Sequence, residues 1–214
     1  LQSLRMIKQP EEIEEIRRAV SITGSAFLRV LQKLEPGMYE YEVEAEFLHE
    51  FRRNGTEPSY LPIVGGGENG CILHYTENRD LLQDGDLLLI DAGCEVDGYA
   101  SDITRTFPVN GKYSPAQRQL YEIVLEAQHA AISAIKPGKH WNDPHDAAVR
   151  SITDGLMRLG ILKGKRAELL KKEAYRKYYM HKTGHWLGMD VHDVGQYKVG
   201  GRWRRFEPGI VLTV

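Results

Sequence analysis

Two aspartates stand where a short strand and the segment after it could bring carboxylates together. Asp91 ends the apolar run Leu87–Ile90, and Asp102 follows the turn-forming residues beyond it, so the sequence predicts a β-hairpin. If the turn is centred on Val96-Asp97, the two aspartates lie directly opposite each other. If Asp97-Gly98 forms a two-residue loop, they are diagonal neighbours. Both registers place the carboxylates on one face of the sheet.

Like charges at this spacing need compensation. Directly opposed β-carbons are roughly 5 Å apart, and two carboxylates there destabilise a sheet unless a cation or a shared proton intervenes. The alternative is that a bulge turns one aspartate towards solvent. Asp91 favours a metal site, because an acid at the end of a buried strand is costly to desolvate without a partner.

A histidine cluster is the second group with metal-binding chemistry. His181, His185 and His192 lie within residues 181–193, and neutral imidazole binds divalent first-row metals or polarises a substrate. The spacing of the first two matches a helical zinc pair, but no glutamate follows His181, and Gly184 and Gly188 disfavour a helix. A single histidine in a loop is more often structural, whereas three together favour a site. The residue types alone leave open which histidine binds metal and which contacts substrate. No role is assigned to His49, His129, His140 and His145.

Composition narrows the class of protein. The chain has 214 residues, of which 42% are hydrophobic and 27% charged, which indicates one soluble globular domain with a substantial core. A formal net charge of −2 with scattered basic residues argues against a nucleic-acid surface. No apolar run is long enough to span a bilayer, and Leu1–Glu15 lacks a signal-peptide pattern, so we expect no membrane partner and a cytoplasmic location. Two cysteines, Cys71 and Cys94, are too few for a disulfide framework.

Periodicity and punctuation predict a mixed α/β (α+β) class. Helical spacing runs from Pro10 to Leu34, through Val43–Phe51, from Pro115 to Ile135 and from Asn142 or Asp143 to Leu159. Strand signals cover Gly70–Thr76, Asp86–Gly93 and Tyr99–Val109. The breaks Pro36-Gly37 and Pro137-Gly138 are 101 residues apart, which suggests an internal duplication of helix, break, helix and strands. Chance similarity is the alternative, because Pro-Gly often follows a helix.

Four motifs in this order resemble the Xaa-Pro aminopeptidases: Ile72-Leu73-His74-Tyr75, Ile90-Asp91-Ala92-Gly93, Ser101-Asp102-Ile103-Thr104-Arg105-Thr106 and Gly184-His185-Trp186-Leu187-Gly188. The resemblance covers nearly the whole chain, from Gly65–Gly70 to Glu207-Pro208-Gly209 and a final strand expected over Ile210–Val214. It implies the pita-bread fold, a pseudo-twofold repeat of helices packed on a curved, mostly antiparallel sheet. It also implies that residues 1–12 are a linker from a preceding N-terminal domain and that residues 13–214 form the catalytic domain.

The resemblance further implies a site with two divalent metal ions, usually Mn²⁺, where a bridging water or hydroxide attacks the peptide bond before proline. Asp91 would be bidentate to one metal, Asp102 would bridge both, and His185 would complete one coordination sphere. His192 and His74 would stabilise the tetrahedral intermediate, and His181 would shape the proline pocket. An oxygen-rich ligand set fits manganese better than a sulfur-seeking metal.

Two departures from the family pattern affect these expectations. Lys182 stands where related sequences usually carry glycine. The family also has two further glutamate ligands beyond the position of Val214, so we expect the chain to hold an incomplete metal site and to be inactive by itself.

Two other functions compete with the aminopeptidase. A prolidase, which cleaves only Xaa-Pro dipeptides, would share the fold, metals and histidines. A non-catalytic pita-bread module would bind peptides or proteins without metal, but such modules typically lose the ligands that Asp91, Asp102 and His185 retain. For the full-length protein we also expect a homo-oligomer.

Overall fold

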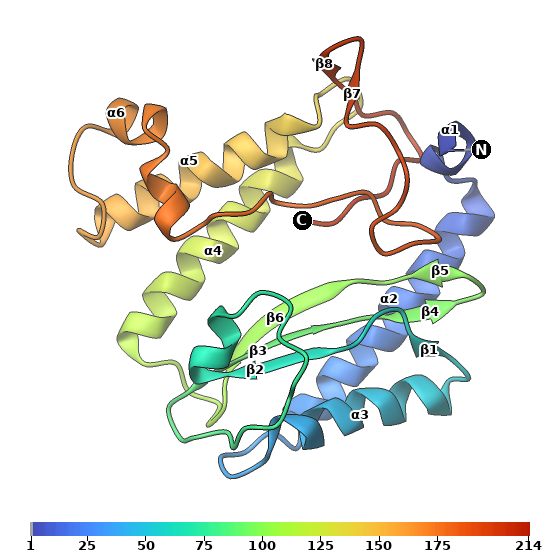
Figure 1. Ribbon diagram of the computed structural model, residues 1–214, viewed down its shortest axis with the longest axis vertical. Helices are drawn as coiled ribbons and strands as arrows, with labels where there is room; N and C mark the ends of the chain where they lie inside the picture. Colours follow the sequence, from blue (N-terminus) through green and yellow to red (C-terminus); the bar gives the residue numbers. More distant parts are fainter. Residues whose placement is uncertain (1) are drawn as a thin grey trace. The chain divides into compact units, whose positions relative to one another are not determined.

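The computed structural model describes residues 2–214, and the chain divides into two structural units (Figure 1). The sheet unit consists of Lys8–Ser114 together with Leu187–Asp193. The helical unit consists of residues 2–7, Pro115–Trp186 and Val194–Val214. Each unit contains one of the two helix pairs predicted from the sequence.

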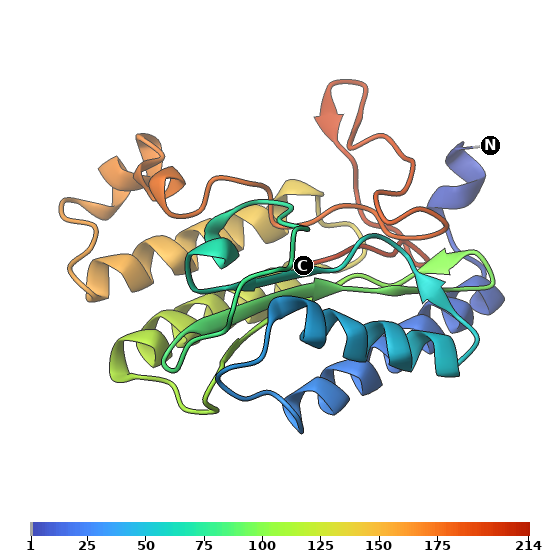
Figure 2. The same cartoon turned by 60° about the horizontal axis from the view of Figure 1, so that its bottom comes forward.

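In the sheet unit two helices cover one face of the strands (Figures 1 and 2). The helices are α2 (Pro10–Leu31) and α3 (Glu40–Arg53), and a 3₁₀ turn, η1 (Gly67–Cys71), follows the second strand. The strands form two antiparallel sheets, in the orders β1-β4-β5 and β2-β3-β6. They are β1 (Glu57–Pro58), β2 (Ile63–Gly66), β3 (Leu87–Ala92), β4 (Cys94–Val96), β5 (Tyr99–Ala100) and β6 (Ile103–Pro108).

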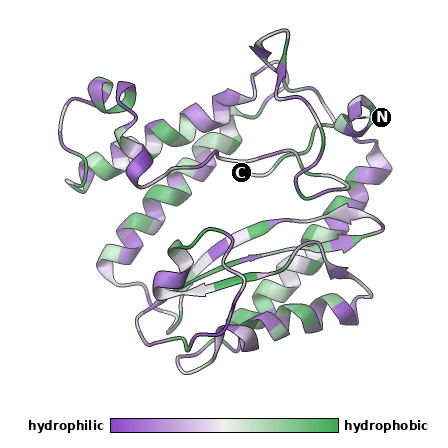
Figure 3. Ribbon diagram, in the orientation of Figure 1, coloured by the Kyte–Doolittle hydropathy of each residue, from purple (hydrophilic) through white to green (hydrophobic). Residues whose placement is uncertain are grey.

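The helices form where the sequence predicts them. Pro10 occupies the first position of α2, and both α2 and α3 are amphipathic, with polar and apolar residues alternating along them in Figure 3. Their apolar stripes pack Phe27, Phe47 and Phe51 against the inner face of β3. Burial alternates along β3, so that Leu88, Ile90 and Ala92 face the helices while Asp91 faces the opposite side.

The hairpin adopts the second of the two registers considered. Asp97-Gly98 is the loop, both residues have positive φ (48° and 83°), and Val96 pairs with Tyr99. This combination is a two-residue turn that matches the twist of the strands. Asp91 pairs with Thr104, and Asp91 and Asp102 are therefore diagonal neighbours on one face.

In the helical unit α4 (Pro115–Ala134) packs on α5 (Asn142–Arg158). Gly155 allows this close approach, because a β-carbon there would lie 2.4 Å from Cγ2 of Ile123. A second cluster forms around Trp186, Met6 and Phe206. The shorter elements are α1 (Gln2–Met6), α6 (Arg166–Lys171), η2 (Ala174–Lys177), β7 (Lys198–Val199) and β8 (Arg202–Trp203).

Two predicted strands are wrong. The segment Gly70–Thr76 consists of the end of η1 and a loop, in which His74 has φ 58° and the side chains of Ile72 and Leu73 are 55% and 63% exposed. The apolar run there is not part of a core. Ile210–Val214 makes only an isolated bridge, between Leu212 and Trp186, instead of a strand ladder.

Within the segment 1–12, which was expected to be a linker, residue 1 lies outside the described part of the chain. Residues Gln2–Met6 form α1, and α2 already begins at Pro10. Among residues 2–214, no helix combines the length and the apolar character that crossing a bilayer requires.

Candidate metal centre

The two aspartates singled out in the sequence meet at one tyrosine. The Tyr60 hydroxyl lies 2.5 Å from Oδ1 of Asp91, to which it donates, and 3.1 Å from Oδ1 of Asp102. All three side chains are only partly accessible, and all belong to the sheet unit. A single hydroxyl thus spans two carboxylates that project from neighbouring positions of one hairpin.

The electrostatics of this group fit a cation. Burial raises the pKa of Asp91, and the negative charge of Asp102 raises it further, while hydrogen bonds from Tyr60 and Thr104 act in the opposite direction. Burial and the two carboxylates also raise the pKa of Tyr60, so this tyrosine stays protonated and acts as a donor. A divalent ion would supply the missing positive charge, and carboxylate oxygens suit Mn²⁺ or another hard cation.

A close backbone contact fixes where Asp102 lies. A β-carbon on Gly93 would be 1.8 Å from the carbonyl oxygen of Ser101, so only glycine fits. The Ser101 side chain is fully buried; its hydroxyl lies 2.8 Å from that of Thr23 and accepts the backbone N–H of Cys94 at 3.0 Å. These contacts lie between the β4–β5 and β3–β6 ladders, and Asp102 stands in the short break between β5 and β6.

The loop that carries His192 is anchored in the sheet unit. Lys8 and Asp193 form an ion pair at 2.9 Å, with side chains 2% and 0% exposed. Nearby, the backbone N–H of Ala100 donates to the carbonyl of Gly188 at 2.9 Å. Since Ala100 lies two residues before Asp102, the loop is tied to the hairpin that bears the carboxylates.

His74 also belongs to the sheet unit, where it lies in the loop after η1. Its side chain is exposed, and its backbone adopts the left-handed region that few non-glycine residues occupy. Strained backbone of this kind often accompanies function, and here it needs support from the rest of the loop.

His185 and His181 belong to the helical unit. The Nδ1 atom of His185 lies 2.9 Å from the Trp186 carbonyl oxygen, which selects the tautomer with its lone pair on Nε2. The His185 carbonyl oxygen accepts the backbone N–H of Thr213 at 2.9 Å, and the His185 backbone N–H donates to the Thr213 hydroxyl at 3.1 Å. An imidazole held through one nitrogen in this way is typical of a metal ligand. His181 is exposed, with Nδ1 2.8 Å from the carbonyl oxygen of Lys182.

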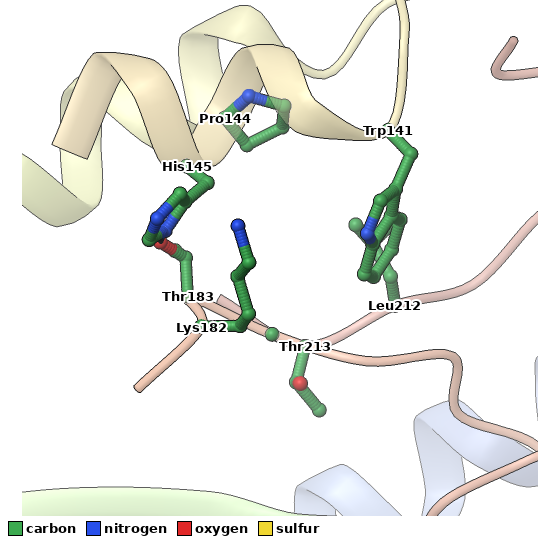
Figure 4. Close-up of a pocket in the computed structure, with 8 residues that line it drawn as sticks. Trp141, Pro144, His145, Lys182, Thr183, Leu212 and Thr213 are labelled. Carbon is green, nitrogen blue, oxygen red and sulfur yellow. Dashed lines mark hydrogen bonds between the residues drawn. The ribbon is translucent and has the colours of Figure 1, made fainter. Parts of the chain in front are cut away.

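A small pocket in the helical unit is lined in part by Lys182, Thr183 and Gly184, the three residues before His185 (Figure 4). The Lys182 amine extends into it between His145 and Trp141, and Nδ1 of His145 lies 2.9 Å from the Thr183 hydroxyl. Burial lowers the pKa of His145, and the charge of Lys182 lowers it further, which keeps this imidazole neutral. The departure at Lys182 therefore places a cation in a pocket lined by Trp141, Pro144, His145, Lys182, Thr183, Gly184, Leu212 and Thr213.

The predicted site residues fall in both units. Asp91, Asp102, His74 and His192 belong to the sheet unit, and His181 and His185 belong to the helical unit. Within residues 2–214, no three His, Cys, Asp or Glu side chains converge as a metal cluster, so the carboxylate pair is the part that the described structure assembles.

Sequence reasoning missed Tyr60. It lies three residues before Ile63, which pairs with Asp91, so a correct alignment of β2 with β3 would have placed it near the carboxylates. Its residue type gave no signal, because tyrosine is common beside strands.

Known proteins that are similar to this chain are metallopeptidases. The model of metallopeptidase family M24 matches residues 14–214. The Xaa-Pro aminopeptidase of Escherichia coli is 54% identical over 212 residues, which are 99% of this chain and 48% of that protein. The Haemophilus influenzae Xaa-Pro aminopeptidase is 52% identical over 215 residues, 100% of this chain and 50% of that protein. The chain spans about half the length of the curated relatives it matches.

Solved structures give the same result. Pseudomonas aeruginosa aminopeptidase PepP aligns with a TM-score of 0.97 at 54% identity, over 98% of this chain and 48% of that one. A variant of E. coli aminopeptidase P in complex with substrate aligns with a TM-score of 0.95 at 54% identity, over the same shares. The fold is therefore the expected pita-bread fold of these proteins. The matched family consists of metallopeptidases, whose chemistry depends on a divalent metal. The chain belongs to metallopeptidase family M24.

Proposed function

We propose that the full-length protein is a metal-dependent Xaa-Pro aminopeptidase, which hydrolyses the bond between an N-terminal residue and a following proline. The observation that carries this proposal is the 54% identity with the E. coli Xaa-Pro aminopeptidase across 99% of the chain. The aspartate pair that shares the Tyr60 hydroxyl supports it, because neighbouring carboxylates can hold the metal ions of a two-metal hydrolase.

The proposed metal ligands in this chain are Asp91, Asp102 and His185. Asp91 and Asp102 would hold the metal through their carboxylates, and His185 would hold it through Nε2. Two Mn²⁺ ions would suit this ligand set, because it is rich in oxygen and lacks sulfur. One solved relative is a zinc-substituted form of E. coli aminopeptidase P in complex with product.

When bound, the two ions would supply an activated water and polarise the peptide carbonyl. The chain's own residues would position the substrate and stabilise charge. His192 and His74 would donate hydrogen bonds to the oxygen that becomes negative in the tetrahedral intermediate. His181 would contact the proline ring. Tyr60, as a protonated donor, would hold the two aspartates in place.

We also propose an oligomeric state and a cellular location for the full-length protein. The resemblance favours a homo-oligomer, which light scattering of the full-length protein tests. A cytoplasmic location is expected from the sequence, and cell fractionation tests it.

The decisive experiment uses the full-length protein, stripped of metal with a chelator and reloaded with Mn²⁺. We expect release of the first residue from a tripeptide with proline in second place, and no turnover of the same peptide with alanine there. A matching Xaa-Pro dipeptide separates this activity from that of a prolidase, which would cleave only the dipeptide. Equal turnover of the proline and alanine tripeptides contradicts the proposal.

A further inference from the structure

Glu40 is a fully buried carboxylate at the first position of α3, and its exposed fraction is 0%. Four donors surround it. Oε1 accepts from the backbone N–H of Gly66 at 2.8 Å and from the Asn69 amide at 3.0 Å. Oε2 accepts from the Tyr75 hydroxyl at 2.7 Å and from the backbone N–H of Asp80 at 3.0 Å. Hydrogen bonds to an ionised acceptor are roughly twice as strong as those between neutral groups.

These donors come from the whole length of one loop. Gly66 is the last residue of β2, and Asp80 lies where the chain returns to α3, so one carboxylate binds both ends of the segment 66–80. The Glu40 backbone N–H in turn donates to the Asp80 carbonyl at 3.0 Å. Joining the two ends fixes the base of the loop and restricts its conformations.

The loop carries His74, and apolar packing does not hold it there. The side chains before it, Ile72 and Leu73, are mostly exposed, whereas Tyr75 directly after it is only 8% exposed. Burial, together with the hydrogen bond to Glu40, raises the pKa of Tyr75 to about 12, so its hydroxyl remains a donor. His74 itself has a left-handed backbone, which persists only where neighbouring contacts enforce it.

We propose that Glu40 is the positioning residue for His74, because its carboxylate holds the loop 66–80 at both ends and through Tyr75. Glu40 touches neither metal nor substrate and acts through the histidine. The inference rests on the proposed function, in which His74 stabilises the tetrahedral intermediate.

Glu40→Gln is the sharpest variant, since the shape is kept while one oxygen becomes an NH₂ group that faces donors. Misplacing a catalytic group by about 1 Å can cost on the order of 10²-fold in rate, and we expect a fall in kcat of that order in the full-length protein loaded with Mn²⁺. KM and metal content should change little. The matched control is Glu42→Gln in the same helical turn, where the exposed Glu42 caps Tyr39 and glutamine serves equally well.

A double-mutant cycle separates positioning from a general loss of structure. If Glu40 acts through His74, Glu40→Gln in a His74→Ala background leaves the residual kcat of the single His74→Ala variant unchanged. Fully multiplicative losses would overturn the proposal.

Hydrogen exchange of the full-length protein gives an answer that does not depend on activity. Glu40→Gln should accelerate exchange of the amides in 67–80, relative to Glu42→Gln, while those of β3 and β6 keep their protection. Unchanged exchange of the amides in 67–80 would overturn the proposal that Glu40 holds this loop. If Glu40→Gln does not fold, Tyr75→Phe removes one of the four donors and should accelerate exchange in the same segment to a smaller extent. If the wild-type protein cleaves no Xaa-Pro peptide, the proposed function fails, and the exchange result still decides whether Glu40 fixes the loop.

Discussion

Asp91 and Asp102 lie on one face of a single hairpin, and Tyr60 places its hydroxyl between their carboxylates. The diagonal register brings the two acids near each other without making them a directly opposed pair. Two negative groups in a partly buried setting therefore share a neutral donor. A cation bound by both carboxylates would stabilise this pair of acids further.

Asp102→Asn should weaken Mn²⁺ binding by the full-length protein by more than about 100-fold, because loss of a ligand exceeds the 10–100-fold effect typical of outer partners. The neutral amide cannot bridge two ions as a carboxylate does. Titration calorimetry of the chelator-treated protein measures the change. Asp97→Asn is the matched control, since Asp97 lies at the exposed tip of the same hairpin and asparagine accepts its positive φ. If Asp102→Asn and Asp97→Asn bind Mn²⁺ with equal affinity, Asp102 is not a metal ligand.

Tyr60→Phe should destabilise the metal-free protein by about 1–3 kcal/mol, because two partly buried carboxylates lose a shared donor. Saturating Mn²⁺ should recover part of this loss, since a cation compensates the same charges. Thermal unfolding with chelator and with Mn²⁺ provides both values. Tyr41→Phe, which removes a hydroxyl from an exposed tyrosine of α3, is the control. A loss that is identical with and without metal would mean that a cation does not take over the role of the Tyr60 hydroxyl between the two carboxylates.

The sequence predicted the helices and the central hairpin because their signals are local. Pro10 and Pro115 begin α2 and α4, and the turn chemistry of Asp97-Gly98 limited the hairpin to two registers, of which one is observed. The residue types left two registers open, and the structure has the one in which Asp97-Gly98 forms the loop and Gly93 closely approaches Ser101 across the hairpin.

The loop around His74 was misassigned for the opposite reason. The run Cys71–Thr76 has strand-like residue types, yet its conformation depends on polar contacts made by residues far away in the sequence. Glu40 binds the loop from α3, and Asn78 binds it to β2, accepting from the N–H of Val64 at 3.0 Å and donating to the Pro62 carbonyl at 2.9 Å. Residue patterns reveal apolar faces well, but they do not show which buried carboxylate a loop will surround.

The buried pair of Lys8 and Asp193 should behave as a unit. Asp193→Asn or Lys8→Met alone should destabilise the protein by about 3–5 kcal/mol, because each removes the opposite charge from a charged group that stays in a dry site. Lys8→Met combined with Asp193→Leu should be closer to wild type than either single variant. Urea unfolding measures all three. Arg158→Met, which breaks an exposed pair with Glu126, is the control and should cost about 0–1 kcal/mol. Additive losses in the double variant would show that the two charges do not interact.

The cap of α2 should make stability depend on pH. Glu12 accepts the backbone N–H of Gln9 at 2.7 Å and the Tyr99 hydroxyl at 2.7 Å, and these bonds, the first being the larger cause, hold the pKa of Glu12 below its usual value. A lowered folded pKa means that the ionised carboxylate stabilises the protein above the unfolded value of about 4.3, and that this stabilisation is lost as pH falls through the folded pKa.

Glu12→Ala should therefore cost about 1 kcal/mol at pH 7, as expected for removal of a capping partner, and the difference from wild type should shrink below about pH 4. Urea unfolding at a series of pH values follows the difference directly. Glu14→Ala, at an exposed position of α2 two residues after Glu12, should show neither the loss nor its pH dependence. If the cost of Glu12→Ala stays constant from pH 7 down to pH 3, the carboxylate contributes through packing alone, and the charge-assisted bond from Gln9 to Glu12 does not stabilise the start of α2.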